Sequence, residues 1–138
     1  MLMSRGNQQR RSSVGGARSK KQTKVPTKED FIKKRDFTGA LALLEFQRRN
    51  GDNMDSEEDE IECLMWIGYC AFHLGKYERA QEIYMELMGG DLGKCPPDAP
   101  LYLACVYYYM QMYKEASESA SDIKKVSGRA AGARRRLE

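Results

Sequence analysis

Histidine occurs only once in this sequence of 138 residues, and no long apolar run is present. Because His73 is the single histidine and no serine or cysteine stands in a nucleophile motif, the chain offers no ordinary set of residues for general-base or covalent catalysis. No glycine-rich phosphate-binding loop follows a predicted strand. The apolar stretch of about 18 residues that a membrane-spanning helix needs is also missing. We therefore expect no enzyme, no cofactor and no membrane contact.

Only four cysteines are present, and they fit free thiols better than disulfides. Three of them, Cys63, Cys70 and Cys105, fall inside predicted helices at positions typical of a core, where a thiol acts as a small apolar group. A zinc site at Cys63, Cys70 and His73 is the alternative, but this spacing on one helix is not that of a structural zinc site, and a fourth ligand is missing. We expect a reducing compartment and no metal.

Both ends of the chain are basic. Residues 1–25 contain seven basic residues and no acidic ones, with few large apolar side chains, which predicts a disordered basic arm. Lysine and arginine recur between glycine, alanine and serine near the other end, which predicts a basic flexible tail over residues 127–138. The domain between them spans residues 26–126. These bases have no interleaved aromatic residues, so we expect no nucleic-acid function, although salt-dependent, non-specific binding by the arms is compatible with the charge.

Residues 52–62 form an acidic block of seven acids without a base. One interpretation is a solvated loop that runs into a helix start, where acids favour the positive end of the helix dipole. The other is a contact surface for a basic partner. The sequence leaves both open.

Two stretches of the chain can be superposed at a spacing of 36 residues, from Ile67 to Ala80 and from Leu103 to Ala116. Small residues where two helices touch and an aromatic residue at the start of the second helix are typical of the tetratricopeptide repeat. We therefore predict an all-α fold, with about three helical hairpins stacked as a short right-handed solenoid. The first helix is predicted to be short and to begin at Thr27, capped with Asp30. The repeat-defining residues are Phe37, Ala40, Gly68, Tyr77, Ala80, Ala104, Tyr113 and Ala116.

A partner-binding groove is predicted by the register of the repeats. In such arrays the first helix of each hairpin lines the concave side, and its positions 2, 5, 9 and 12 face the groove; Glu62 and Asp98 stand at position 2. The predicted groove residues are Met65, Tyr69, Phe72, His73, Leu101, Cys105 and Tyr108. Such an apolar and aromatic face can anchor a peptide. Contacts with neighbouring helices inside the array are the alternative explanation for each of these residues.

The same register argues against one known mode of binding. Tetratricopeptide co-chaperones hold the acidic C-termini of large chaperones with lysine and asparagine at positions 5 and 9 of the first helices. This chain has Met65 and Tyr69 in one unit, and Leu101 and Cys105 in the next. The carboxylate clamp is absent.

The segments from Lys34 to Phe46 and from Trp66 to Gly75 go beyond the general repeat pattern. With Val25-Pro26-Thr27 and Leu103-Ala104-Cys105, they resemble the N-terminus of the tetratricopeptide subunit of intraflagellar-transport complex B, the intraflagellar transport protein 56 or tetratricopeptide repeat protein 26 family. The resemblance covers roughly residues 24–120. Members of that family are several times longer, and the glycine, alanine and arginine tail departs from them, which fits a truncated or variant form.

This resemblance implies a non-enzymatic scaffold needed for cilium or flagellum assembly and motility. Its expected partners are other complex B subunits and motility-related cargo. Its expected locations are the cilium or flagellum, the ciliary basal body and the cytoplasm. The alternative is a free-standing tetratricopeptide adaptor unrelated to cilia.

Overall fold

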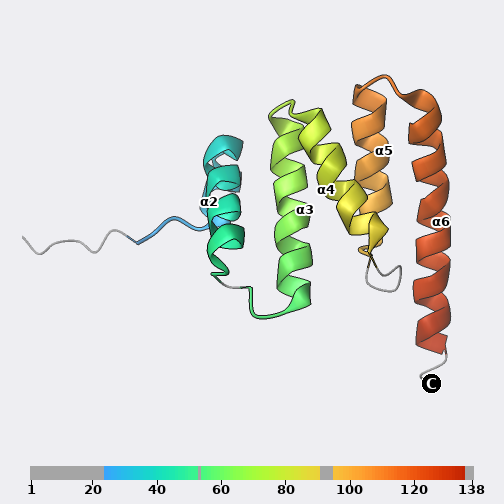
Figure 1. The fold of residues 1–138 in the computed structure, drawn as a ribbon, viewed down its shortest axis with the longest axis horizontal. Coiled ribbons are helices and arrows are strands. Elements are labelled where there is room, and N and C mark those ends of the chain that lie inside the picture. Colours follow the sequence, from blue (N-terminus) through green and yellow to red (C-terminus); the bar gives the residue numbers. More distant parts are fainter. Residues whose placement is uncertain (1–23, 53, 91–94, 136–138) are drawn as a thin grey trace, which may run out of the picture.

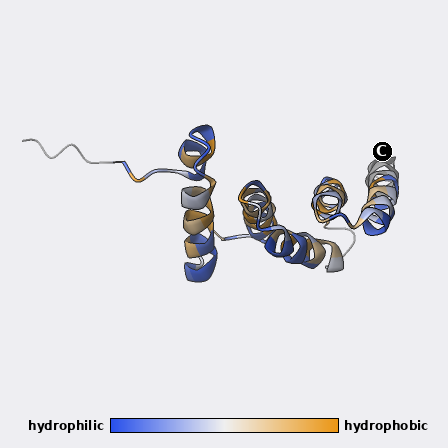
Figure 2. Ribbon diagram, turned by 90° about the horizontal axis from the view of Figure 1, so that it is seen from above, coloured by the Kyte–Doolittle hydropathy of each residue, from blue (hydrophilic) through white to orange (hydrophobic). Residues whose placement is uncertain are grey.

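A computed structural model of the chain describes residues 24–52, 54–90 and 95–135. The described residues form helices and no strand, which confirms the all-α prediction. The helices are α1 (Lys28–Lys33), α2 (Phe37–Asn50), α3 (Glu57–His73), α4 (Tyr77–Gly89), α5 (Ala99–Tyr109) and α6 (Tyr113–Arg135). Each packs against its neighbours in the chain, and α3 also contacts α5. The helices from α2 to α6 follow one another along the long axis, as expected for stacked tetratricopeptide-like hairpins (Figures 1 and 2).

Hydrogen bonds from side chains fix the starts of α1 and α3. The Asp30 carboxylate accepts from the backbone N–H of Thr27 at 3.0 Å and from the Thr27 hydroxyl at 3.2 Å, so α1 begins where the sequence predicts. These bonds, the backbone one first, hold the pKa of Asp30 below its ordinary value. At α3, the N–H of Asp59 donates to the Ser56 hydroxyl and the N–H of Ser56 donates to the Asp59 carboxylate. Two capping boxes therefore define these helix starts.

The acidic block ends in the first turn of α3, where four consecutive acids follow the Ser56 cap. Their negative charges lie beside the unpaired N–H groups at the positive end of the helix dipole. This placement gives the block a structural role, as its first interpretation predicts. The second interpretation, a contact surface for a basic partner, stays a prediction.

Turns of one shared geometry join the two helices of each hairpin. Arg35, Gly75 and Gln111 have left-handed backbones, with φ of 55°, 74° and 62°. In each turn the next residue donates its N–H to the carbonyl five residues earlier at 2.9 Å; the pairs are Asp36 with Phe31, Lys76 with Ala71, and Met112 with Tyr107. This geometry ends each first helix in the manner of a Schellman motif, for which glycine is the preferred residue.

Replacing Gln111 with glycine should stabilise the protein by about 1 kcal/mol, because a left-handed backbone strains a residue that has a Cβ atom and glycine avoids that strain. Urea unfolding followed by circular dichroism measures the change. Gln111→Ala is the control, since alanine keeps the Cβ atom and should give no gain. A glycine variant no more stable than the alanine variant would show that the turn stores no strain.

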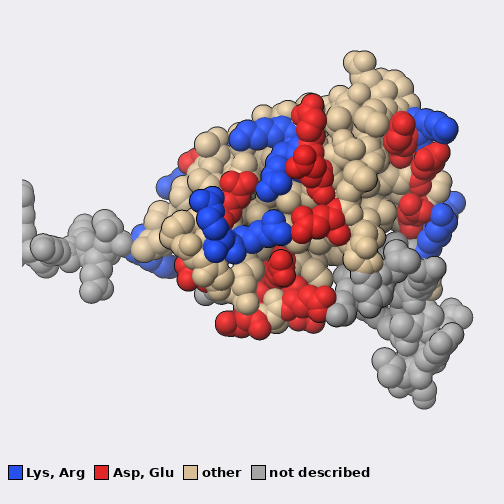
Figure 3. All heavy atoms as spheres, in the orientation of Figure 1, with Lys and Arg blue, Asp and Glu red and all other residues tan. Residues whose placement is uncertain are grey.

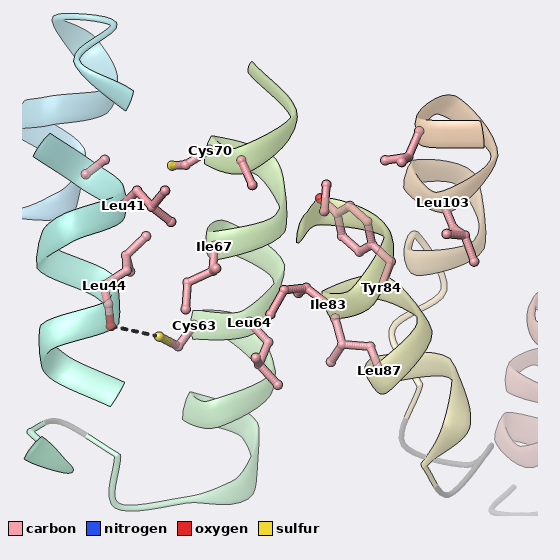
Figure 4. Packing of buried hydrophobic residues seen from close by; sticks show 14 of the residues in the cluster. Leu41, Leu44, Cys63, Leu64, Ile67, Cys70, Ile83, Tyr84, Leu87 and Leu103 are labelled. Atoms are coloured by element: carbon pink, nitrogen blue, oxygen red, sulfur yellow. Dashed lines mark hydrogen bonds between the residues drawn. The ribbon is translucent and has the colours of Figure 1, made fainter. Parts of the chain in front are cut away.

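The core lies between successive helices, with α3 at its centre. Leu41 and Leu44 of α2 point towards Ile67 on one side of α3, while Ile83 and Leu87 of α4 pack on the other side (Figure 4). All five side chains are buried. Because each helix is covered mainly by its sequence neighbours, each interface is needed to bury the next.

Gly68 allows the closest approach between α3 and α4. A Cβ atom at Gly68 would lie 2.6 Å from Cζ and 2.9 Å from the hydroxyl oxygen of Tyr84. The Tyr84 side chain is itself 1% exposed, so the ring has little room to move. Ala80, another small residue of the repeat pattern, is completely buried. Small side chains therefore stand where the two helices touch.

The predicted domain division stays a prediction. Its boundary between residues 126 and 127 falls inside α6, which continues as a helix to Arg135. Alanine and arginine have high helix propensity, so a segment without a clear apolar period can extend a helix that has already started. The predicted basic arm, residues 1–25, lies outside the described residues except for Lys24 and Val25.

All four cysteines are free, and the burial of one of them, Cys105, differs from the prediction. Cys63 and Cys70 are buried in α3, and the Cys63 thiol lies 3.7 Å from the carbonyl oxygen of Leu44. Burial raises the pKa of Cys70 to about 11, which makes its thiol unreactive at neutral pH. Cys105, predicted to be core-like, is exposed, whereas Cys95 outside the helices is buried. Because the sequence of α5 is apolar throughout, it did not indicate that Cys105 is exposed.

Candidate binding groove

Two adjoining hollows lie beside α3 and α5. The first encloses about 300 Å³ and is lined by Tyr69, Phe72, His73, Tyr84, Tyr102, Cys105 and Tyr109. The second encloses about 280 Å³ and is lined by Met65, Trp66, Tyr69, Asp98 and Tyr102. Because Tyr69 and Tyr102 border both hollows, we treat them as one site and call these residues together the aromatic groove.

The helical period places these side chains on common faces. On α3, Met65, Tyr69 and Phe72 are spaced by four and three residues, so they lie along one side of the helix. On α5, Tyr102 and Tyr109 are separated by seven residues, or about two turns. Both helices are first helices of their hairpins. The groove therefore spans two repeats.

Aromatic contacts tie each hairpin to the next. Phe37 at the start of α2 stacks on His73 at the end of α3, with ring centroids 4.6 Å apart. Tyr77 at the start of α4 stacks on Tyr109 at the end of α5, at 5.8 Å. The equivalent residue of the third hairpin, Tyr113, is 60% exposed. The aromatic residue of the repeat thus packs on the following hairpin, and this explains why Phe37 and Tyr77 are covered while Tyr113 is not.

Five of the predicted groove residues line the aromatic groove: Met65, Tyr69, Phe72, His73 and Cys105. The other two, Leu101 and Tyr108, line neither hollow and are 48% and 61% exposed. Each of these two residues directly precedes Tyr102 or Tyr109, and a shift of one residue turns the direction of a side chain by about 100°. Cys105 is thus the one α5 residue predicted for the groove that lines these hollows, and a partner contact at Leu101 and Tyr108 stays a prediction.

Residues that the repeat register did not predict complete the groove. Tyr102 and Tyr109 come from α5, Trp66 comes from α3, and Tyr84 comes from α4. The ring of Tyr84 stacks on that of Tyr102 at 5.7 Å with an interplanar angle of 16°. Tyr102 and Tyr109 are seven residues apart, which places them on one side of α5 and could have indicated a shared site. Leu101 and Tyr108 have the same spacing, so the sequence did not distinguish the two pairs.

The hydroxyl of Tyr84 is buried and has no hydrogen-bond partner among the described residues. Burial also raises the pKa of this phenol, so it stays protonated at all physiological pH values. Buried polar groups in folded proteins are nearly always hydrogen-bonded, and an unsatisfied one costs about 1–3 kcal/mol. Tyr84 therefore carries an unsatisfied hydroxyl that the surrounding residues close off from solvent.

Charged residues are few around the groove. Lys28 lies over the Trp66 ring, 5.5 Å from its centroid, and forms an ion pair with Glu62. The hydrogen bond from Lys28 lowers the pKa of Glu62. Asp98, just before α5, makes no capping hydrogen bond through its side chain and no ion pair with a described residue. The one unpaired formal charge among the groove residues is thus negative.

The face formed by α2 and α4 has a different character. Basic and acidic side chains intermingle on it (Figure 3), and Arg48 contacts Glu86 at 3.0 Å while Arg79 contacts Glu45 at 3.8 Å. These pairs are partly exposed, so each contributes about 0–1 kcal/mol to stability. They link α2 to α4 across the outside of α3 without forming a patch of one sign.

The part of the chain that the structure describes contains no group of three histidine, cysteine or acidic residues placed to hold a metal ion. Cys63 and Cys70 are buried in α3, whereas His73 is exposed at its end. No described helix is both long enough and apolar enough to cross a membrane.

Comparison with known proteins identifies relatives of the chain. The family model described as Intraflagellar transport protein 56 matches residues 64–134. A curated Caenorhabditis elegans protein named Intraflagellar transport protein 56 homolog is 33% identical over 116 residues, which is 84% of this chain. The chain spans only 20% of the length of that relative. No solved structure matches the chain. Because both the family model and this relative cover more than half of it, the chain belongs to the intraflagellar transport protein 56 family.

Proposed function

We propose that this protein is a non-enzymatic scaffold of intraflagellar transport, and that it binds another subunit of complex B through the aromatic groove. Family membership supports the transport role. The groove is the observation that carries the binding role. It offers large aromatic side chains from two repeats, and such side chains dominate the free energy of many protein interfaces. The alternative of an adaptor unrelated to cilia has no such family support.

Tyr69 is the residue on which this proposal is best tested, because it borders both hollows and contacts Trp66 and Phe37. Tyr69→Glu should reduce the recovery of complex B subunits in a pull-down by tenfold or more, since a carboxylate in an apolar contact must lose its hydration on binding. Glu78→Lys on the exposed side of α4 is the control and should leave recovery unchanged. Circular dichroism checks that both variants are folded. Equal recovery with wild type and Tyr69→Glu would remove the groove from the proposal.

The proposed locations are the cilium or flagellum, the ciliary basal body and the cytoplasm. Fluorescently tagged protein should concentrate at basal bodies and move along cilia in cells that carry them. A uniform cytoplasmic signal with no enrichment at basal bodies would argue for the free-standing adaptor instead.

A further inference from the structure

We propose that the aromatic groove binds a partner segment that combines an apolar side chain with a neighbouring lysine or arginine. This inference rests on the proposed function and specifies the chemistry of the partner. Three independent features of the groove support it.

The first feature is the size of the site. The two hollows enclose about 300 Å³ and 280 Å³, and they share Tyr69 and Tyr102. Volumes of this order are typical of sites that hold small ligands or single side chains.

The second feature is the shape and composition of the walls. Phe72 and Tyr109 meet edge to face at 5.1 Å, and Trp66 and Tyr69 do so at 5.5 Å. These contacts fix the rings before a partner arrives, so little side-chain entropy is lost on binding. Together the rings form a preformed apolar site for one or two side chains of a peptide.

The third feature is the charge. Asp98 is exposed at the border of the second hollow, and its carboxylate has no ion-pair partner in the described part of the chain. The nearest cation to the groove, Lys28, is already paired with Glu62. A carboxylate with free acceptor sites favours lysine or arginine on the ligand, and no unpaired cation lines the groove to receive an acidic ligand. The partner segment is therefore basic rather than acidic.

A peptide-display experiment tests this chemistry. Random 12-residue peptides are selected for binding to the full chain. Peptides retained by wild type and lost on Tyr69→Glu should be enriched in an aromatic or large aliphatic residue close to lysine or arginine. Synthetic copies of the selected peptides are then titrated by fluorescence anisotropy.

Asp98→Asn is the test of the charge. It should weaken binding several-fold at low salt and much less at high salt, because the attraction between the charges is screened. Glu78→Gln, an exposed acid outside the groove, should not change the affinity.

The outcomes separate the two proposals. If the selected peptides are lost on Tyr69→Glu but bind Asp98→Asn as they bind wild type, the groove is a binding site and the inferred chemistry is overturned. Enrichment of acidic peptides overturns it too. Peptides that bind Tyr69→Glu normally, or no enrichment at all, contradict both proposals.

A synthetic peptide of residues 1–23, which is itself basic, serves as competitor. If it binds the groove more tightly than the selected peptides, the occupant is a segment of this chain and not a partner.

Discussion

Replacing Gly68 with leucine is expected to lower the free energy of unfolding by about 1–3 kcal/mol, the usual cost of forcing extra volume into a packed core. The Cβ atom alone would lie 2.6 Å from the Tyr84 ring, and that ring is buried and stacked on Tyr102. Relief requires α4 to move away from α3 or the ring to leave its position. Either movement also disturbs the aromatic groove.

Urea unfolding measures this loss, and Gly128→Leu is the matched control. Both glycines lie in helices, but a Cβ atom at Gly128 in α6 meets nothing within 4 Å. Leucine has a higher helix propensity than glycine, so the control variant should be as stable as wild type or slightly more so. Equal unfolding midpoints for Gly68→Leu and wild type would contradict the tight packing of α3 on α4.

Truncating Leu103 to alanine is expected to cost about 2–5 kcal/mol, because its side chain is 4% exposed and leaves a cavity between α5 and its neighbours. For a domain whose total stability is about 5–15 kcal/mol, this is a large fraction. If the hairpin of α5 and α6 came away, α4 would also become exposed, because each hairpin is buried by the next.

Leu101→Ala provides the comparison for Leu103→Ala. The same substitution two residues earlier on α5 removes a side chain that is 48% exposed, and it should cost less than about 1 kcal/mol. Thermal and urea unfolding of the two variants measure the difference. Similar losses at both positions would mean that α5 buries a different face from the one observed.

Much of the fold could be predicted from local sequence. The repeat at a spacing of 36 residues predicted the hairpins, and the Thr27–Asp30 pair predicted the start of α1. These features depend on residues close together in the chain, whose hydrogen bonds and backbone preferences act within one or two helical turns. The groove residues of α3 followed from the same register, because Gly68 marks the side of the helix that packs closely on α4.

The sequence of α5 contained no such marker. Its eleven residues, from Ala99 to Tyr109, include no charged residue, and every side of the helix is apolar. Leu101 and Tyr108 were therefore as plausible for the groove as Tyr102 and Tyr109. The packing of α4 and α6 against α5 decided between them: it covers Leu103 and Val106 and brings Tyr109 against Phe72 and Tyr102 against Tyr84.

Amino-acid order alone thus established the helical hairpins, their pairing and the cap of α1, because short-range interactions specify these. The orientation of a uniformly apolar helix, the burial of Tyr84 without a partner and the juxtaposition of two repeats at one groove were decided by tertiary packing. Each of these depends on residues far apart in the chain. Burial of apolar area is non-directional, so an apolar helix takes the orientation that its neighbours leave room for.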